Sequence, residues 1–302
     1  MENGAGTSPN RLMAGTLVGT GLGVTGFFVA SVNSKGMGFV MFLLIPLVAG
    51  MIVGWIIPSR KAIGKSALVS LIGSLFFLVA LGKEGVLCAL MAFPLLLACV
   101  LIGALIGAGL RMVIKPKRDG NITAGMFVVV APLVIFAGKQ VERPLLDQVR
   151  VEAVTNSVHV AGTTENTWLQ IQSIDSVHGS KPWLMYVGLP VPQRCTLEKA
   201  AEGARRTCYF DKGYIEETVM AWDPPRHMGL RIDRTHMPGR HWLGFENADY
   251  WLHPEGSGTR LTRTTSISSH LYPAWYWRTL ERWGVSSEHR YILQDAVIRA
   301  ER

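Results

Sequence analysis

Five apolar runs follow one another in the first 138 residues, and they constrain the fold of this chain more than any other feature. A helix of about 20 apolar residues crosses the roughly 30 Å hydrocarbon layer of a bilayer. We therefore expect an all-α membrane bundle over residues 1–145. Its five transmembrane helices are predicted near residues 12–32, 37–57, 66–82, 86–110 and 122–138. The first run is followed by further apolar runs and has no clear cleavage site, which argues against a cleavable signal peptide.

The basic residues between the runs indicate how the bundle is oriented. The 58–65 and 111–121 loops hold seven Lys and Arg residues, whereas the alternate loops hold only Lys35 and Lys83. Positive loops stay in the cytoplasm, so we expect a multi-pass protein of a bacterial cytoplasmic (inner) membrane. Its N-terminus is then cytoplasmic and its C-terminal domain extracytoplasmic. If the short fifth run does not span, the C-terminal domain lies in the cytoplasm instead.

The apolar runs contain no Asp, Glu, Lys, Arg or His, which argues against an ion-coupled transporter. They do contain small residues at four-residue spacing, and such ladders let helices approach closely. Either packing within the bundle or a homo-oligomer accounts for them. The ladders are Gly15, Gly19 and Gly23, then Gly50 and Gly54, then Gly103 and Gly107.

The formal net charge of +8 is concentrated in the first half of the chain. Residues 1–138 hold ten basic and three acidic side chains, and residues 139–302 hold twenty and nineteen. A nucleic-acid binder needs its positive excess on a folded binding surface. Here the excess lies between apolar runs, so we expect the membrane, and no nucleic acid, as the partner.

From about residue 148 the apolar residues come in short alternating runs separated by turns, a pattern typical of antiparallel strands. A first strand (148–160) is followed by a short helix (163–174) and an irregular segment. Six strands come next, and a long helix starts near Pro273 and ends the chain. The second half is therefore predicted to be an α+β domain. The six strands are expected within residues 193–210, 214–222, 226–232, 244–252 and 259–268.

Three stretches in this order resemble the START-like superfamily, also called SRPBCC, helix-grip or polyketide cyclase/lipid transport-like. They are "VHVAGTTENTWLQI" (158–171), "WDPPRHMGL" (222–230) and "TRLTRTTSISSHLYPAWYW" (259–277). One departure is that Gly162 and Thr163 stand where the family usually has Ala-Pro or Pro-Pro. For residues 146–302 the resemblance implies a curved antiparallel sheet around a long C-terminal helix, with a cavity between them. Members bind apolar or amphipathic small molecules such as lipids.

Aromatic and small residues on the expected strands and the last helix are the candidate lining of such a cavity, because small-molecule sites are mostly apolar with few polar groups. A packed interior without a cavity is one alternative. Another is that Tyr272, Trp275 and Trp277 enter the bilayer surface as an interfacial anchor. The candidate ligand-binding residues are Trp168, Trp183, Phe210, Tyr214, Trp222, Trp251, Trp283, Gly284, Ser287 and Tyr291.

No catalytic motif and no metal-ligand spacing occurs in the sequence, so we expect neither a catalytic set nor a metal or cofactor. If an acid or base exists, the candidates are Glu217, Asp249 and His270. Cys195 and Cys208 are predicted to lie opposite each other if a four-residue loop closes the 193–210 hairpin. They form either a disulfide or a pair of buried thiols.

Three functions fit these observations. The first is a membrane-anchored START-like domain that binds a lipid or another apolar or amphipathic small molecule. The second is an enzyme, cyclase-like or hydrolase-like, that acts on such a ligand. The third is a structural or interaction module without a ligand. Polar groups that converge inside the cavity would favour the enzyme.

Overall fold

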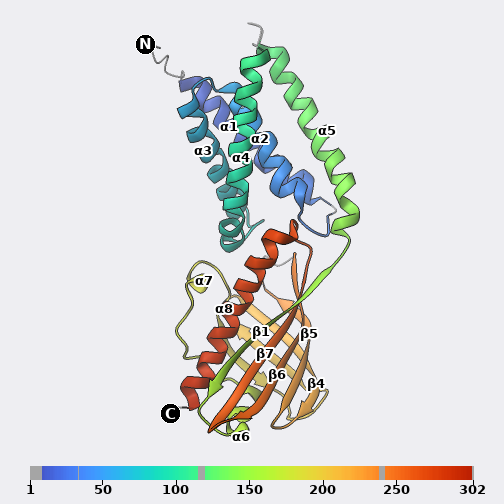
Figure 1. Ribbon diagram of the computed structural model, residues 1–302. Helices are drawn as coiled ribbons and strands as arrows, with labels where there is room; N and C mark the ends of the chain where they lie inside the picture. The colour runs from blue at the N-terminus through green and yellow to red at the C-terminus, as the bar shows by residue number, and fades with distance from the viewer. Residues whose placement is uncertain (1–8, 33, 115–119, 238–241, 301–302) are drawn as a thin grey trace. The chain divides into compact units, whose positions relative to one another are not determined.

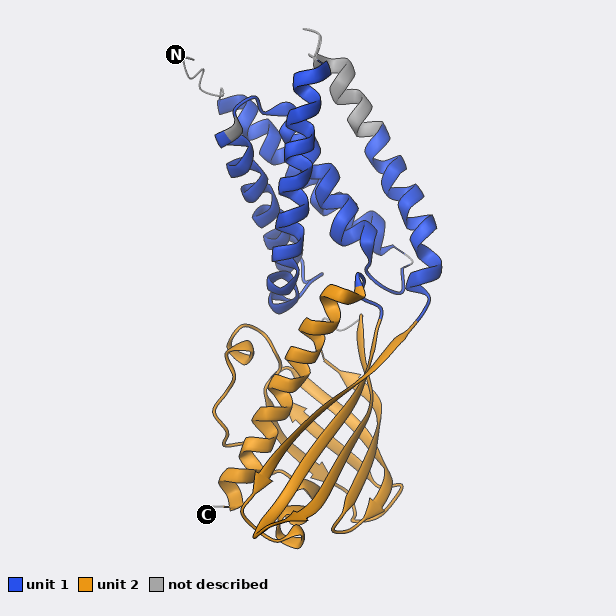
Figure 2. Cartoon of the chain, in the orientation of Figure 1, with its two compact units in different colours: residues 1–148, 270–273 blue, residues 149–269, 274–302 orange. Residues whose placement is uncertain are grey.

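The computed structural model of the chain describes residues 9–32, 34–114, 120–237 and 242–300, with only the backbone described for residue 60 and residues 120–129. The chain forms two compact units (Figure 2). Unit 1 comprises residues 1–148 and 270–273, and unit 2 comprises residues 149–269 and 274–302. The 270–273 segment belongs to unit 1 because Met37 N–H donates to the carbonyl of His270, and Tyr272 N–H donates to the carbonyl of Met37.

Unit 1 consists of helices (Figure 1). Among the residues whose side chains are described, three helices are long and apolar enough to cross a membrane: Pro9–Ser31, Lys61–Ala80 and Val86–Ile114. The elements in order are α1 (Pro9–Ser31), the π-helix η1 (Val40–Leu44), α2 (Ile45–Ile56), α3 (Arg60–Ala80), α4 (Val86–Ile114) and α5 (Gly120–Leu146).

The prediction of five spans is therefore not supported. The second predicted span forms only the short apolar helix Val40–Ile56, because the chain before it makes the bridge at Met37 instead of a helical turn. The fifth predicted span, 122–138, lies in α5, but its side chains before residue 130 are outside the described residues. Three of the basic residues used for the orientation also lie outside them, namely Lys115, Lys117 and Arg118.

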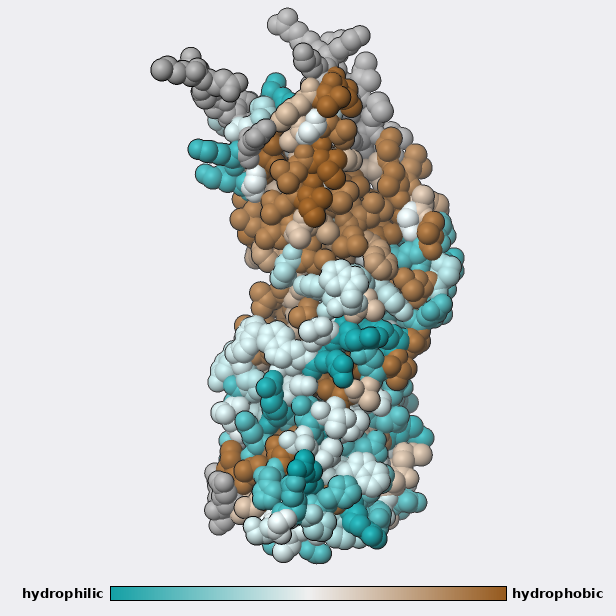
Figure 3. All heavy atoms as spheres, in the orientation of Figure 1, coloured by the Kyte–Doolittle hydropathy of each residue, from teal (hydrophilic) through white to brown (hydrophobic). Residues whose placement is uncertain are grey.

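The outer surface of unit 1 is apolar. Phe76 and Leu105 are each 73% exposed, and Val113 is 82% exposed. Figure 3 shows unit 1 mostly in brown, whereas the same face of unit 2 is mostly teal and white. A large exposed apolar surface marks an interaction site, and helices of this length with such a surface fit the interior of a bilayer.

The predicted small-residue ladders lie at helix contacts inside unit 1. A Cβ atom added to Gly50 or Gly54 on α2 would overlap the carbonyl oxygen of Val100 or Ala104 on α4. In return, a Cβ atom on Gly103 or Gly107 of α4 would overlap a carbonyl oxygen of α2. The ladder on α1 contacts Ile57 and the serines of α3 in the same way. These glycines let the helix backbones approach closely within one chain.

Charged side chains of unit 1 lie at helix ends, where backbone groups lack helical partners. Glu142 of α5 accepts hydrogen bonds from the backbone N–H groups of Phe39 and Val40 at the start of η1. Arg111 of α4 donates to the last carbonyl groups of α2, at Trp55 and Ile56, with both distances 3.2 Å. A carboxylate at a helix N-terminus and a guanidinium at a C-terminus both complement the helix dipole.

Unit 2 is a seven-stranded antiparallel sheet in the order β1-β7-β6-β5-β4-β3-β2 that curves around the C-terminal helix α8 (Figure 1). The predicted order of strand, helix, irregular segment, six strands and long helix is confirmed. The elements are β1 (Arg150–Val160), α6 (Thr164–Gln172), the one-turn α7 (Trp183–Tyr186), β2 (Pro192–Leu197), β3 (Arg205–Phe210), β4 (Gly213–Asp223), β5 (His227–His236), β6 (Leu243–Glu255), β7 (Gly258–Ser269) and α8 (Ala274–Ala300).

Local sequence accounts for the turns and helix starts of unit 2. Thr163, which departs from the family pattern, is the N-cap of α6, and its side chain accepts a hydrogen bond from the backbone N–H of Asn166 at 3.3 Å. Between β4 and β5, Arg226 N–H donates to the carbonyl of Asp223 across the two prolines. Gly256 has a φ of +59° in the β6–β7 turn, a conformation that favours glycine.

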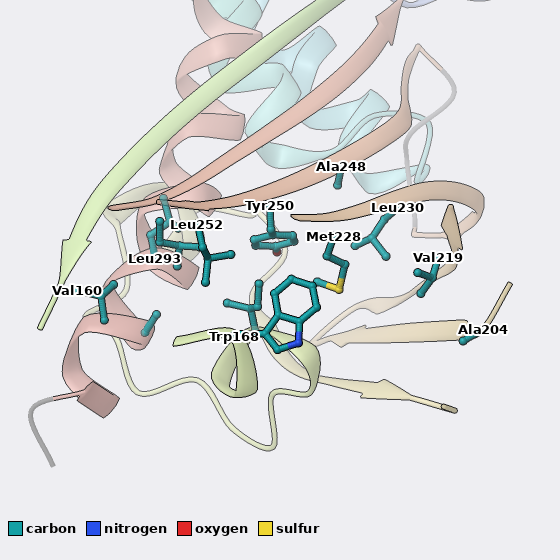
Figure 4. Packing of buried hydrophobic residues seen from close by; sticks show 13 residues of the cluster. Val160, Trp168, Ala204, Val219, Met228, Leu230, Ala248, Tyr250, Leu252 and Leu293 are labelled. Atoms are coloured by element: carbon teal, nitrogen blue, oxygen red, sulfur yellow. The ribbon is translucent and has the colours of Figure 1, made fainter. Parts of the chain in front are cut away.

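The core of unit 2 lies on the concave face of the sheet, because alternate residues of each strand point inward. Figure 4 shows Trp168, Met228 and Tyr250 pointing toward one another from α6, β5 and β6. Each of these side chains is at most 3% exposed. Leu293 of α8 is fully buried in the same cluster, so the helix closes the open side of the curved sheet.

Candidate ligand-binding interior

The buried face of α8 has open space beside one residue. Gly284 is buried, yet a Cβ atom added there would meet no atom within 4 Å. Other buried glycines differ: a Cβ atom at Gly258, for example, would lie 2.4 Å from the carbonyl oxygen of Val160. Ser287 and Tyr291 follow Gly284 on this face and are 2% and 3% exposed. The structure therefore leaves open space where a side chain at position 284 would begin.

Two exposed tryptophans lie at the edge of this face. Trp183 of α7 and Trp283 of α8 have ring centroids 5.4 Å apart and are 52% and 37% exposed. Tyr186, on the same turn of α7, is 76% exposed. Trp283 directly precedes Gly284 in the sequence, so this aromatic group lies within one helical turn of the open space along α8. It is an apolar surface that a small molecule can contact from solvent.

An ion pair lies one turn further along α8. Glu288 Oε1 accepts from Nη1 of Arg263, on β7, at 3.1 Å. The guanidinium lies over the ring of Tyr250, with 5.4 Å between Cζ and the ring centroid. Burial lowers the pKa of Arg263, but the charges of Glu288, Tyr250 and Glu217 outweigh that effect and the pKa lies above its ordinary value. Arg263 is therefore always a cation.

A second ion pair lies further along the sheet. Arg206 of β3 faces Glu217 of β4, and Nη1 donates to Oε2 at 2.6 Å. The two side chains are 2% and 7% exposed. Arg206 also donates to the carbonyl groups of Ile171 and Gln172 at the end of α6. This pair joins the sheet to α6.

His289 is a buried neutral base. It is 0% exposed, and its ring nitrogens lie 2.7 Å from Thr265 Oγ1 and 3.0 Å from Asn156 Oδ1. Burial, together with the nearby charge of Arg263, lowers the pKa of His289 to about 2. Asn156 Oδ1 can only accept, so Nδ1 carries the hydrogen atom and Nε2 accepts from Thr265. Because both nitrogens are occupied, His289 holds β1, β7 and α8 together.

The structure brings some of the predicted lining residues together. The ring centroids of Trp168 and Trp222 are 5.0 Å apart. Trp168 belongs to the buried core cluster, and Trp222 packs against that cluster. Phe210 packs against the buried cluster that includes Ile292 of α8. Trp183 and Trp283 contact each other, and Gly284, Ser287 and Tyr291 lie on the buried face of α8.

Two predicted lining residues do not face the interior. Trp251 is 41% exposed and stacks on His227, with ring centroids 3.7 Å apart. Tyr214 stacks on His236 at 4.3 Å. Neighbours along a strand point to opposite faces, so the inward position next to Trp251 belongs to Tyr250, and the one next to Tyr214 belongs to Ile215.

Sequence reasoning missed most of the polar interior. Besides Glu217, that interior includes Arg206, Tyr250, Arg263, Glu281, Glu288, His289 and Asp295. A signal for Arg263 exists in the alternation of β7, where the inward positions are Leu261, Arg263, Thr265 and Ile267. Of the candidate acids and bases, Glu217 pairs with Arg206. Asp249 contacts His227 at 2.9 Å, and His270 lies in unit 1.

Cys195 and Cys208 are joined by a disulfide, with 4.0 Å between their Cα atoms. They occupy directly opposite positions of β2 and β3, so the predicted register of this hairpin is confirmed. Within the described part of the chain, no group of three or more His, Cys, Asp or Glu side chains is placed to hold a metal ion.

No protein-family model and no curated protein matches the chain. Solved structures similar to it include a protein from Nitrosospira multiformis, at 16% identity over 49% of this chain and 94% of that one, with a TM-score of 0.32. Others are protein Ms6760 from Mycobacterium smegmatis, at 15% identity over 51% and 98% with a TM-score of 0.34, and XoxI from Bacillus cereus, at 16% over 50% and 98% with a TM-score of 0.34.

Proposed function

We propose that this chain is a membrane-anchored START-like protein whose unit 2 binds a lipid or another apolar or amphipathic small molecule between α8 and the concave face of the sheet. The observation that carries the proposal is the open space beside buried Gly284. Protein interiors are close-packed, and an apolar void is costly unless something occupies it. The exposed pair Trp183 and Trp283 is the entrance.

The membrane anchor supports this function. Three apolar helices of unit 1 are long enough to span a bilayer, and apolar ligands are concentrated in membranes. We propose a bacterial inner membrane with an extracytoplasmic unit 2, because the Cys195–Cys208 disulfide suits an oxidising compartment. The loop charges agree with that orientation if α5 also crosses the membrane.

Photo-crosslinking tests the proposal. Hexadecane with a terminal diazirine is added to the full chain in dodecylmaltoside micelles, and labelled peptides are mapped by mass spectrometry. We expect saturable labelling of α8 (Ala274–Ala300). Gly284→Phe fills the open space and abolishes this labelling, whereas Gly109→Phe, in unit 1 and also facing open space, leaves it unchanged. Absence of saturable labelling in α8 would refute the proposal.

An enzyme acting on such a ligand is the second candidate, favoured by the convergence of Arg263 and Glu288 in the interior. His289 is not a general base near neutral pH, because its pKa is about 2 and both nitrogens are engaged. Lipid extracted from the membrane is incubated with the wild-type chain and with the Glu288→Gln variant. A new product mass that needs Glu288 supports the enzyme, and unchanged masses support a binding protein.

A further inference from the structure

The segment that joins α6 to β2 (173–191) is fixed to the rest of unit 2 near both of its ends. Ile174 exchanges two backbone hydrogen bonds with Cys195, at 2.9 and 2.7 Å. At the other end, the N–H of Val191 donates to Oδ1 of Asp211 at 2.8 Å, and the N–H of Asp211 donates to the carbonyl of Val191 at 3.0 Å. The two ends of the α6–β2 segment therefore cannot move without breaking paired hydrogen bonds.

The first part of the α6–β2 segment lies against α8. The N–H of His178 donates to Oδ1 of the buried Asp295 at 2.7 Å. The next residue, Gly179, approaches the helix backbone closely, since a Cβ atom added there would lie 2.9 Å from the carbonyl oxygen of Tyr291. Successive residues of the segment thus meet α8 at positions that run back toward the start of the helix.

The α6–β2 segment then passes the open space described above. Trp183 contacts Trp283, so the segment runs antiparallel to α8. Gly284 and Ser287 lie on α8 between Trp283 and Tyr291, and both are buried. Gly284, Ser287 and Tyr291 follow one another at spacings of three and four residues, which places them on one side of the helix. That side is the one along which the segment runs.

The middle of the α6–β2 segment, residues 180–187, is held differently from its ends. Within the part of the chain that the structure describes, its hydrogen bonds stay inside the segment: the N–H of Met185 donates to the carbonyl of Pro182, and that of Val187 to the carbonyl of Leu184. Burial of the Leu184 and Met185 side chains holds it in place instead. A stretch without hydrogen bonds to the surrounding fold opens more easily than the strands and helices beside it.

A glycine lies at each end of this middle part. Gly179 precedes it, and Gly188 follows it with a φ of +129°, a conformation that favours glycine. Hinges are a few loop positions that absorb large changes of φ and ψ, and glycine allows such changes most readily. Residues 180–187 can therefore swing about two fixed points while the ends of the segment stay paired.

Resting on the proposed function, we propose that residues 180–187 are a lid that opens about Gly179 and Gly188 and admits the ligand to the space beside Gly284. The ring contact of Trp183 with Trp283 is the latch that holds the lid closed. The closed lid covers the side of α8 that carries Gly284, and the open lid exposes it. The lid thereby sets how fast the ligand enters and leaves.

Rates of ligand entry and release test the lid. The full chain in dodecylmaltoside micelles is mixed with the diazirine-bearing hexadecane, and irradiation at successive times gives the rate at which α8 becomes labelled. A chase with plain hexadecane before irradiation gives the release rate. Trp183→Ala removes the latch, so we expect both rates to rise about three- to tenfold, as the loss of one aromatic pair allows. The half-saturating concentration then changes by less than about twofold, because entry and release change together.

A second variant opens the lid from its other end. The Cβ atom of Gly179→Ala crowds the carbonyl oxygen of Tyr291 and pushes the segment away from α8, so we expect both rates to rise again. Two matched controls keep the wild-type rates. Trp251→Ala removes a ring contact on the outer face of the sheet, and Gly162→Ala adds a Cβ atom that has no neighbour within 4 Å.

The outcomes separate the lid from the proposed function. Wild-type rates in both Trp183→Ala and Gly179→Ala overturn the lid and leave the proposed function intact. A rise of the release rate alone in Trp183→Ala also overturns the lid, because it makes Trp183 a ligand contact instead of a latch. Absence of saturable labelling of α8 in the wild-type chain overturns both.

Discussion

Arg206 and Glu217 occupy directly opposite positions of β3 and β4, and their side chains meet in the interior at 2.6 Å. Removing one partner of a buried pair leaves the other charge uncompensated, so we expect Arg206→Met to lower the free energy of unfolding by about 3–5 kcal/mol. The double variant Arg206→Met/Glu217→Leu is expected to lose less free energy of unfolding than Arg206→Met, because no unpaired charge remains. Urea unfolding of the full chain in micelles, followed by tryptophan fluorescence, measures both. A double variant less stable than Arg206→Met would contradict this account.

The close contact of α2 and α4 makes a prediction for unit 1. A Cβ atom at Gly107 overlaps the carbonyl oxygen of Met51, so Gly107→Ala is expected to cost about 1–3 kcal/mol. Gly109, two residues further on, faces open space, and Gly109→Ala serves as the control. Thermal unfolding in micelles compares the two variants. Equal melting temperatures would show that the helices do not meet at Gly107.

The buried imidazole of His289 makes unit 2 sensitive to acid. Its pKa is about 2 in the folded chain, against an ordinary 6.5, so below pH 6.5 the unfolded chain takes up a proton that the folded chain does not. The free energy of unfolding therefore falls by about 1.4 kcal/mol per pH unit as the pH decreases below 6.5.

Urea unfolding between pH 7.5 and 5 measures this slope. His289→Gln is expected to be less stable at pH 7.5. Its free energy of unfolding should also depend less steeply on pH, because the contribution of one proton is missing. His159→Gln, at an exposed position of β1, keeps the wild-type slope. An identical slope in the His289 variant would exclude this histidine as the source.

The disulfide provides a test of compartment as well as of fold. If unit 2 lies outside the cytoplasm, the chain isolated without reductant is lighter by two hydrogen atoms than the reduced chain, and only Cys88 and Cys99 react with a maleimide after denaturation. Intact-mass spectrometry of membranes prepared under alkylation measures this. Four reactive thiols would argue for a cytoplasmic unit 2 or against the bond.

Much of unit 2 was predictable from local patterns. The alternation of apolar residues gave the seven strands and the long helix. The opposite positions of Cys195 and Cys208 followed from assuming a four-residue loop, and the structure confirms that register, whereas the choice between a disulfide and two buried thiols was open in the sequence. These features depend on neighbours along the chain, which a sequence displays directly.

The candidate site was only partly predictable, for reasons that Trp251 and Arg263 illustrate. Trp251 was selected as an aromatic residue. Because side chains alternate between the two faces of a strand, Trp251 points outward and its neighbour Tyr250 points inward. Arg263 occupies an inward-facing position of β7. A charged residue is expected in the interior only if its partner is known, and the partner Glu288 lies on α8, far away in the sequence. The second predicted span is not supported because hydropathy alone does not give helix length: the chain forms only the shorter apolar helix Val40–Ile56 there.

Native mass spectrometry of the full chain released from micelles tests the central claim most directly, since it asks whether the interior under α8 holds a molecule. The account predicts that the wild-type chain, purified from its own membrane, carries the bound mass of a lipid or another apolar or amphipathic molecule, which Gly284→Phe lacks and Gly109→Phe retains. A bare wild-type chain, or the same bound masses on the wild-type chain and on Gly284→Phe, would contradict it.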